Sequence, residues 1–110
     1  KYRFYSQEVT EINTERSEQH NRTLDRLHEI FLEKNALYGN STSDTFKKFG
    51  ALSYAVRLND KLKRFHSLVL LPDGREGTDD ESMVDTLLDM ANYAILAVMD
   101  IEASRKDNAI

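Results

Sequence analysis

The sequence predicts an all-α protein, a small helical bundle of three main helices with a polar N-terminal arm and a short turn or hairpin near Pro72. Only one proline and four glycines occur in 110 residues, and they are clustered, so the helices between them should be long. After Thr78 the apolar residues also recur at helical spacing over most of the remaining chain. The length fits a single domain, 1–110, with an arm at 1–14 and a bundle at 15–105.

The first helix is expected from about Thr14 to Leu37. Its apolar residues recur at helical spacing: Leu24, Leu27, Ile30 and Phe31. Gly39 follows at the position where a left-handed residue commonly ends a helix. The residues before Thr14 fit neither helical nor strand periodicity, and this indicates an arm.

The second helix is expected to begin at Ser43 or Asp44, either of which can cap it, and to run to about His66. Its expected core positions are apolar: Phe49, Leu52, Ala55, Val56, Leu62 and Phe65. Residues 69–71 then predict a short extended or buried piece, because the following Pro72-Asp73-Gly74 is typical of a tight turn.

The third helix is the best-defined element of the sequence. Thr78 and Glu81 form a capping-box pattern, and the helix is expected to run from there to about Arg105. Apolar residues cover about half of its circumference, which is wider than the stripe of a surface helix. We therefore expect this helix to be central in the bundle, and its surplus apolar surface predicts a homo-oligomer.

Composition excludes several classes of protein. The chain has no cysteine, so disulfide frameworks, thiolate metal sites and cysteine nucleophiles are excluded. A formal net charge of −4 argues against general nucleic-acid binding, which depends on lysine and arginine. No apolar run approaches the roughly 20 residues of a membrane helix. We expect a cytoplasmic protein that does not bind membranes.

An acidic line on the third helix is the first candidate site. Glu81, Asp85, Asp89 and Asn92 are spaced by four, four and three residues, so they share one edge of the helix. Carboxylates on a bundle helix commonly hold Mg²⁺ or Mn²⁺ beside a phosphate substrate. Glu81, Asp85 and Asp89 are therefore candidate metal ligands, with Asp85 and Glu81 also candidate catalytic groups. The alternative is structural, because acids near a helix N-terminus favour its dipole.

A basic stripe on the second helix is the second candidate. Arg57, Lys61 and Arg64 lie within a narrow angular range and could bind a diphosphate or triphosphate. They could equally form a structural ladder of ion pairs with the acidic line of the third helix. The sequence leaves both interpretations open.

The segment that follows the first helix is the third candidate. Lys34, Asn35, Tyr38 and Ser41 surround Gly39, and they combine a cation, an amide, an aromatic ring and a hydroxyl. Such a group could stack on a base and donate hydrogen bonds to it. The alternative is a capped helix end in which Tyr38 only covers the core.

Three stretches together resemble the nucleotide modification associated domain 1 family, a small helical family common in bacteriophages. They are Lys34-Asn35-x-x-Tyr38-Gly39-x-Ser41, then Arg57-x-x-Asp60-Lys61-x-x-Arg64, then the run from Glu81 to Ala94. The resemblance covers about residues 24–102. It implies an all-helical domain of phage nucleotide metabolism or base modification, located in the cytoplasm of a bacterial host.

More remotely, the chain is similar to the all-α nucleoside triphosphate pyrophosphohydrolases, the MazG and dimeric dUTPase group. That similarity implies Mg²⁺-dependent cleavage between the α and β phosphates. That group carries one pair of acidic residues on one helix and a second pair on a later helix. In this chain the second pair becomes Glu81-x-x-x-Asp85, and the first pair has no counterpart. The sequence therefore predicts a partner that is a nucleotide or nucleotide-derived small molecule. It leaves three roles open: a hydrolase, a binding module such as a phage counter-defence protein, or a structural interaction domain.

Overall fold

Four α-helices make up the structure, a computed structural model that describes residues 14–71 and 80–108. They are α2 (Thr14–Tyr38), α3 (Ser41–Phe49), α4 (Leu52–Leu70) and α5 (Asp80–Asn108). No strand occurs within these residues, so the all-α class is confirmed. The expected N-terminal arm, the Pro72 turn and the Thr78 cap lie outside the described residues.

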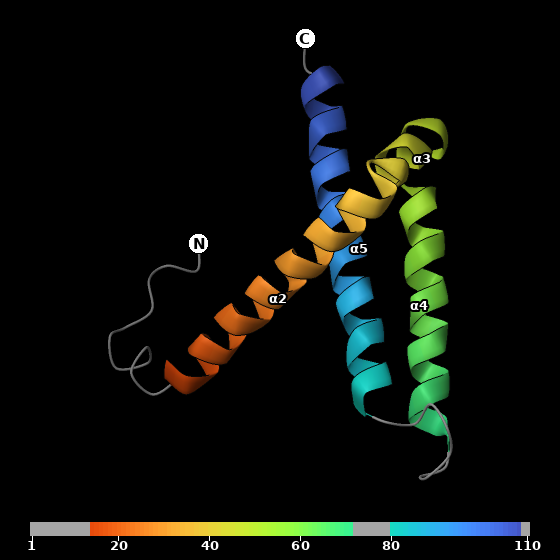
Figure 1. Cartoon of the computed structure of the whole chain (residues 1–110). Helices are drawn as coiled ribbons and strands as arrows, with labels where there is room; N and C mark the ends of the chain where they lie inside the picture. The colour runs from red at the N-terminus through yellow and green to blue at the C-terminus, as the bar shows by residue number, and fades with distance from the viewer. Residues whose placement is uncertain (1–13, 72–79, 109–110) are drawn as a thin grey trace.

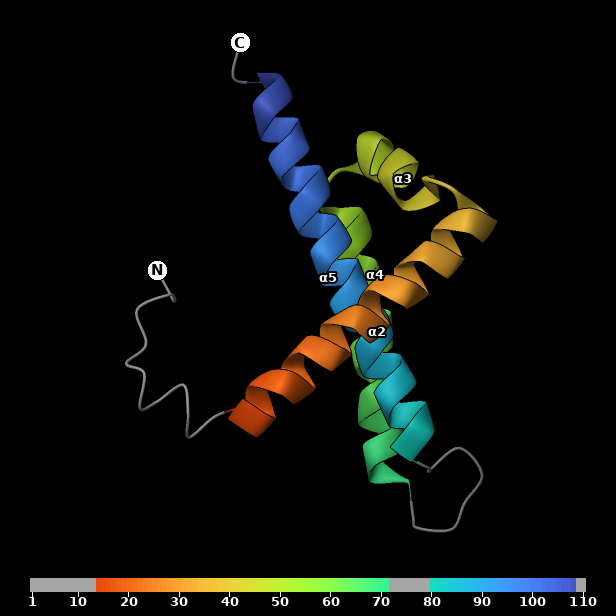
Figure 2. The same cartoon turned by 60° about the vertical axis from the view of Figure 1, so that its left-hand side comes forward.

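The helices α4 and α5 form the main packed pair and lie side by side (Figure 1). Helix α2 crosses α5 obliquely, and α3 lies beside the N-terminal end of α4 (Figure 2). The N-terminal half of α2 projects away from the other helices in both views, and residues 14–26 are exposed. The polar contacts described below therefore concentrate where the second half of α2 meets α4 and α5.

Gly39 ends α2, as the sequence predicts. Its φ of 59° lies in the left-handed region, and its N–H donates to the carbonyl oxygen of Asn35 at 2.8 Å. This is the single-bond αL ending of a helix, for which glycine has no side-chain penalty. The turn lets α3 begin two residues later, at Ser41.

Gly50 divides the segment that was expected to be one helix from Ser43 or Asp44 to His66. That expectation is wrong, because α3 ends at Phe49 and α4 begins at Leu52. Gly50 has φ 71° and ψ −160°, a backbone conformation that is essentially restricted to glycine. Its N–H donates to the carbonyl oxygen of Phe46 at 2.7 Å, which satisfies the end of α3.

Two other helix ends differ from the expectations. Val69 and Leu70 belong to the last turn of α4, so the predicted extended piece is wrong at these two positions, and only Leu71 has extended backbone angles. Helix α5 continues to Asn108, three residues beyond the expected end at Arg105. A short apolar run such as Leu68 to Leu71 is compatible with either state, so the sequence pattern alone could not decide between them.

The buried apolar residues of the described structure are few: Leu27 of α2, Tyr54 and Leu68 of α4, and Leu88 of α5. Thr86 is also buried, with its hydroxyl donating to the Ser82 carbonyl at 2.9 Å. The apolar set expected as core in the second helix is largely wrong. Phe49, the last residue of α3, is 68% exposed. Leu52 is 67% exposed, because α4 turns the side that carries Tyr54 and Leu68 inward.

Candidate functional site

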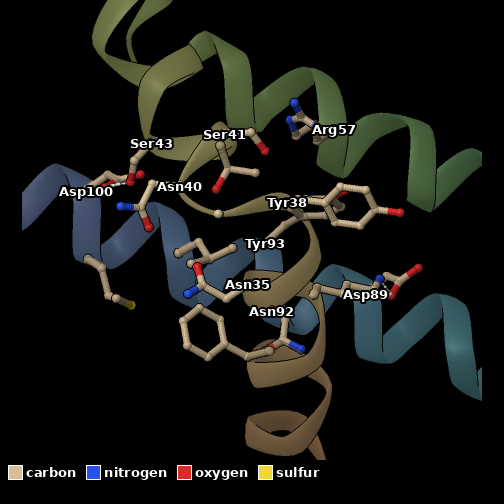
Figure 3. Close-up of a pocket in the computed structure, with 16 residues that line it drawn as sticks. Asn35, Tyr38, Asn40, Ser41, Ser43, Arg57, Asp89, Asn92, Tyr93 and Asp100 are labelled. Carbon is tan, nitrogen blue, oxygen red and sulfur yellow. Dashed lines mark hydrogen bonds and ion pairs between the residues drawn. The ribbon is translucent and has the colours of Figure 1, made fainter.

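A pocket of about 460 Å³ opens where the end of α2, the start of α3 and the middle of α5 meet (Figure 3). This volume lies within the range of about 300–1,000 Å³ that is typical of small-molecule sites. Helix α2 contributes its last two turns, α4 contributes Arg57, and α5 contributes one face from Asp89 to Asp100. The walls are thus held by helices and by the tight turn at Gly39.

The turn at Gly39 sets the geometry of one wall. Tyr38 ends α2 and Ser41 begins α3, so the reversal of the chain at residues 39–40 directs both into the same pocket. Asn35 lies one turn before Tyr38 on α2 and also lines the pocket. The ring of Tyr38 is 68% exposed, so it does not serve the core. The wall therefore offers an amide, a hydroxyl and an accessible aromatic face.

Asp89 of α5 binds two lysines from two other helices. Its Oδ1 accepts from the Lys34 ammonium at 2.7 Å, and its Oδ2 lies 3.0 Å from the Lys61 ammonium. The Asp89 side chain is only 21% exposed, whereas Lys34 is 52% exposed. We call these three residues the lysine–aspartate triad. It ties α2, α4 and α5 together at one end of the pocket.

The contacts within the triad shift the pKa values of Asp89 and Lys34. Burial alone would raise the pKa of Asp89, but the hydrogen bonds from Lys34 and Lys61 outweigh it and hold this pKa below its ordinary value. The hydrogen bond to Asp89 raises the pKa of Lys34, against a smaller opposing effect of burial. Asp89 and Lys34 are therefore both charged at neutral pH. Two ammonium groups on one carboxylate leave one positive charge unbalanced at this end of the pocket.

Arg57 adds a further cation beside the triad. Its guanidinium carbon lies 5.6 Å from the centroid of the Tyr93 ring, which is within the range of a cation–π contact. The contact joins α4 to α5 and positions the guanidinium at the pocket wall. Arginine in this position can still donate in its own plane to a phosphate.

The opposite end of the pocket is acidic. Asp100 accepts from the Ser43 hydroxyl at 2.7 Å and from the Tyr54 hydroxyl at 2.5 Å, so it joins α3, α4 and α5. Burial, followed by the hydrogen bond to Asp100, raises the pKa of Tyr54 to about 12. Each oxygen of Asp100 keeps a further lone pair available as an acceptor. The pocket is therefore cationic at one end and carries acceptors at the other (Figure 3).

Asn92 lies between the two ends. Its side-chain amide donates to the carbonyl oxygen of Leu27 at 3.1 Å, and this bond fixes α2 against α5. One N–H of this amide is thus used within the protein, while Asn92 still lines the pocket. Asn92 therefore has a structural role in holding α2 against α5 and is also accessible from the pocket.

Most of the predicted site residues meet in this pocket. Those that line it are Lys34, Asn35, Tyr38, Ser41, Arg57, Asp89 and Asn92. Lys61 reaches the same place through its ion pair with Asp89. Three predicted residues lie elsewhere: Glu81, Asp85 and Arg64 are exposed and do not line the pocket.

Five polar pocket residues were not among the predicted site residues: Asn40, Thr42, Ser43, Tyr93 and Asp100. A signal for two of them was present in the sequence. Tyr93 follows Asp89 by four residues and Asp100 follows Tyr93 by seven, so both continue the face of the helix that Asp89 occupies. Following that face past the apolar Leu96 would have identified the acidic end of the pocket.

The expected Mg²⁺ site does not fit the geometry of a single chain. Glu81 and Asp85 are exposed and do not line the pocket, and both oxygens of Asp89 already contact ammonium groups. Within residues 14–71 and 80–108, no three His, Asp or Glu side chains are grouped so that they could hold a metal ion. A metal bound by Glu81, Asp85 and Asp89 together therefore has no support from these positions.

Comparison with family models, with characterised proteins and with solved structures finds no match to this chain. The resemblance to the nucleotide modification associated domain 1 family therefore stays a prediction.

Proposed function

We propose that the chain binds a nucleotide or a nucleotide-derived small molecule in the pocket between α2, α3 and α5. Phosphate groups would contact Arg57 and the lysine–aspartate triad. The base would contact the Tyr38 ring, and its edge would meet the amide and carboxylate groups further along the pocket. The observation that carries the proposal is the polarity of the pocket, with cations at one end and hydrogen-bond acceptors at the other.

The cationic end favours an anion of the size of a phosphate group. Arg57 and the triad together present more positive than negative charge, although the whole chain is acidic. Cations gathered in one cavity of an acidic protein raise the local concentration of anions at that cavity. Guanidinium and ammonium groups are the usual protein donors to phosphate oxygens.

The remaining lining favours a flat polar ring system. Tyr38 exposes its ring at the pocket mouth, and Asn35 and Asn40 supply amides that can donate and accept. Base stacking on an aromatic side chain contributes about 1–3 kcal/mol, which makes Tyr38 a substantial contact. The acceptor oxygens of Asp100 suit a base edge that presents N–H groups.

Binding without cleavage is the function that the geometry supports best. The pocket supplies contacts for a phosphate and a ring, but Glu81 and Asp85, the groups expected to catalyse hydrolysis, are not among its lining residues. Hydrolysis stays the alternative, and product analysis distinguishes the two. The chain is therefore proposed to be a binding module, and turnover of the nucleotide is tested separately.

The test is a thermal-shift measurement with ATP, GTP, CTP, UTP and their deoxy counterparts, each with and without Mg²⁺. The matching nucleosides serve as phosphate-free controls. A ligand at one hundred times its Kd stabilises the folded state by about 2.7 kcal/mol, which raises Tm by roughly 10 °C in a domain of this size. We expect at least one nucleotide to give such a shift and its nucleoside to give a smaller one.

A matched pair of variants locates the binding site. Arg57→Ala should weaken the binding about tenfold or more, because it removes a charge-assisted contact. Arg64→Ala removes the same charge from an exposed position of α4 outside the pocket, and it should leave binding unchanged. Equal losses in the two variants, or no shift with any nucleotide, would reject the proposal. Release of pyrophosphate in the same samples would establish the hydrolase alternative.

A further inference from the structure

Asp100 is held in one orientation at the acidic end of the pocket. The Ser43 hydroxyl donates to its Oδ1 at 2.7 Å, and the Tyr54 hydroxyl donates to its Oδ2 at 2.5 Å. These donors belong to α3 and α4, so two other helices fix the carboxylate. Burial and the hydrogen bond to Asp100 raise the pKa of Tyr54 to about 12, so this hydroxyl keeps its proton at neutral pH. Both oxygens of Asp100 therefore act as acceptors.

The same carboxylate is available to a ligand. Asp100 lines the pocket, and each of its oxygens has a second lone pair beside the one that accepts from Ser43 or Tyr54. A carboxylate can accept two parallel hydrogen bonds from a group with two neighbouring N–H donors. The acidic end of the pocket is therefore suited to a ligand edge that presents two such donors side by side.

Asn40 supplies an amide at this end of the pocket. It occupies the N-cap position of α3, where asparagine usually accepts a hydrogen bond from the helix backbone. Its side chain makes no such bond here, and it lines the pocket instead. Ser43, which bonds to Asp100, lies one turn further along α3, so the amide and the carboxylate belong to the same end of the pocket (Figure 3).

An apolar section adjoins the carboxylate. Leu96 and Met99 of α5 line the pocket together with Phe31 of α2, and they suit the faces of a flat ring whose edge reaches Asp100. Asp89, at the cationic end, precedes Asp100 by eleven residues, which is about 16 Å along the helix axis. This separation is comparable to the length of an extended nucleotide, so its phosphates and its base edge can occupy opposite ends.

We propose that the base bound in this pocket is guanine. The inference rests on the proposed nucleotide-binding function and names the base. Guanine is the one common base with two adjacent N–H donors, at N1 and at the 2-amino group, and it carries a carbonyl oxygen at C6 beside them. The two donors match the two oxygens of Asp100, and the carbonyl oxygen matches the N–H groups of the Asn40 amide.

The other bases leave a mismatch at Asp100. Adenine and cytosine each present an amino group next to a ring nitrogen that only accepts, so an acceptor would face a carboxylate oxygen. Uracil and thymine present a single N–H between two carbonyl oxygens. A site built to bond a particular N–H discriminates against a ligand that lacks it, because the polar group of the site is then left unpaired.

The test is titration calorimetry of the wild-type chain with GTP, ITP, XTP and ATP. We expect GTP to bind about tenfold or more tightly than ATP, as is usual for recognition of a base by a two-bond contact. ITP lacks only the 2-amino group and should bind more weakly than GTP. This series needs no variant. Equal affinities for GTP, ITP and ATP would overturn the inference.

Asp100→Asn changes which base fits. An asparagine amide offers one oxygen and one NH₂ group, and this pattern matches xanthine, which has a carbonyl oxygen at C2 in place of the amino group. We expect the variant to lose about tenfold or more in affinity for GTP and to gain affinity for XTP. Asp60→Asn makes the same chemical change at an exposed residue of α4 outside the pocket, and it should keep the wild-type order. Circular dichroism checks that both variants keep their helix content.

The outcomes separate this inference from the proposed function. A wild-type chain that binds none of the four nucleotides would reject both. Binding that Arg57→Ala weakens, but that is equal for GTP and ATP, would reject guanine alone. So would an Asp100→Asn variant that keeps the wild-type preference for GTP over XTP, or one that weakens all four nucleotides equally, because a purely structural role of Asp100 gives no exchange of preference.

Discussion

Asp89 and Lys61 form an ion pair of 3.0 Å between α5 and α4, and the same carboxylate holds Lys34 of α2 at 2.7 Å. One side chain of α5 therefore joins α2, which crosses this helix, to α4, which lies beside it. These contacts also adjoin the candidate pocket, because Asp89 and Lys34 line it. This arrangement links the stability of the fold to the charge of the site.

Replacing Asp89 by asparagine should destabilise the fold at neutral pH. The change leaves two partly buried ammonium groups without their carboxylate, which costs about 1–3 kcal/mol. Because the folded pKa of Asp89 is lowered, its stabilising effect is complete above the ordinary pKa and is lost as the pH falls through the folded value. The difference in Tm between wild type and Asp89→Asn should therefore be largest near pH 7 and should shrink below about pH 4.

Thermal melts of both proteins across this pH range check the prediction. Lys63→Gln serves as the control, since Lys63 is an exposed cation on α4. It should change Tm by little at any pH. A difference between wild type and Asp89→Asn that stays constant from pH 7 to pH 3 would contradict the assigned role of the ion pairs.

Tyr54→Phe should make the fold less sensitive to alkaline pH. The pKa of Tyr54 is raised to about 12, so its hydroxyl contributes stability that is present below pH 10 and is lost as the pH rises from about 10 to 12. The wild type should lose stability over this interval, and Tyr54→Phe should lose less. Denaturant melts between pH 9 and pH 11.5 measure how steeply the free energy of unfolding of each protein falls with pH. Parallel slopes would contradict a buried hydroxyl bonded to Asp100.

Gly50→Ala should destabilise the fold more than Gly39→Ala. Added Cβ atoms meet no neighbour within 4 Å at either glycine, so the cost comes from the backbone alone. Gly39 occupies the left-handed region, where alanine costs about 1–2 kcal/mol. Gly50 has a conformation that side-chain-bearing residues hardly adopt, and we expect about 2–3 kcal/mol there. Urea unfolding of both variants measures the two losses of stability. A larger loss for Gly39→Ala than for Gly50→Ala would contradict the described turn.

Tyr38→Ala should reduce nucleotide affinity without reducing stability. The ring is 68% exposed, so its removal costs the fold little, whereas loss of base stacking should weaken binding about tenfold or more. Tyr38→Phe keeps the aromatic face and should retain most of the affinity. Titration calorimetry with the nucleotide that stabilises the wild type most measures all three proteins. Unchanged affinity in Tyr38→Ala would show that the Tyr38 ring does not contact the nucleotide.

Helical spacing in the sequence predicted much of this architecture. The periodicity around Leu27 and Leu88 identified α2 and α5, and Gly39 correctly marked the end of α2. The break at Gly50 was missed, because a single glycine within a periodic segment is compatible with a continuous helix. Its positive φ depends on how α3 folds back on α4. That packing is not encoded in the local sequence.

The site was predictable where residues share one helix face. Asp89 and Asn92 are three residues apart and lie together in the pocket, and Arg57 meets them from α4. Glu81 and Asp85 belong to the same line on the helix, but they lie nearer its N-terminal end, where α2 no longer crosses α5. Where a crossing helix closes a pocket depends on tertiary packing, so spacing alone could not divide the acidic line into pocket and surface residues.

The most direct test of nucleotide binding in the proposed pocket is a ¹⁵N–¹H NMR titration that follows the side-chain amides of asparagine. The probe is the nucleoside triphosphate with the largest thermal shift. We predict that the amide signals of Asn35, Asn40 and Asn92 move on binding, while that of Asn59, on the outward side of α4, stays in place. Signals of Asn35, Asn40 and Asn92 that remain fixed at saturating nucleotide would contradict the account.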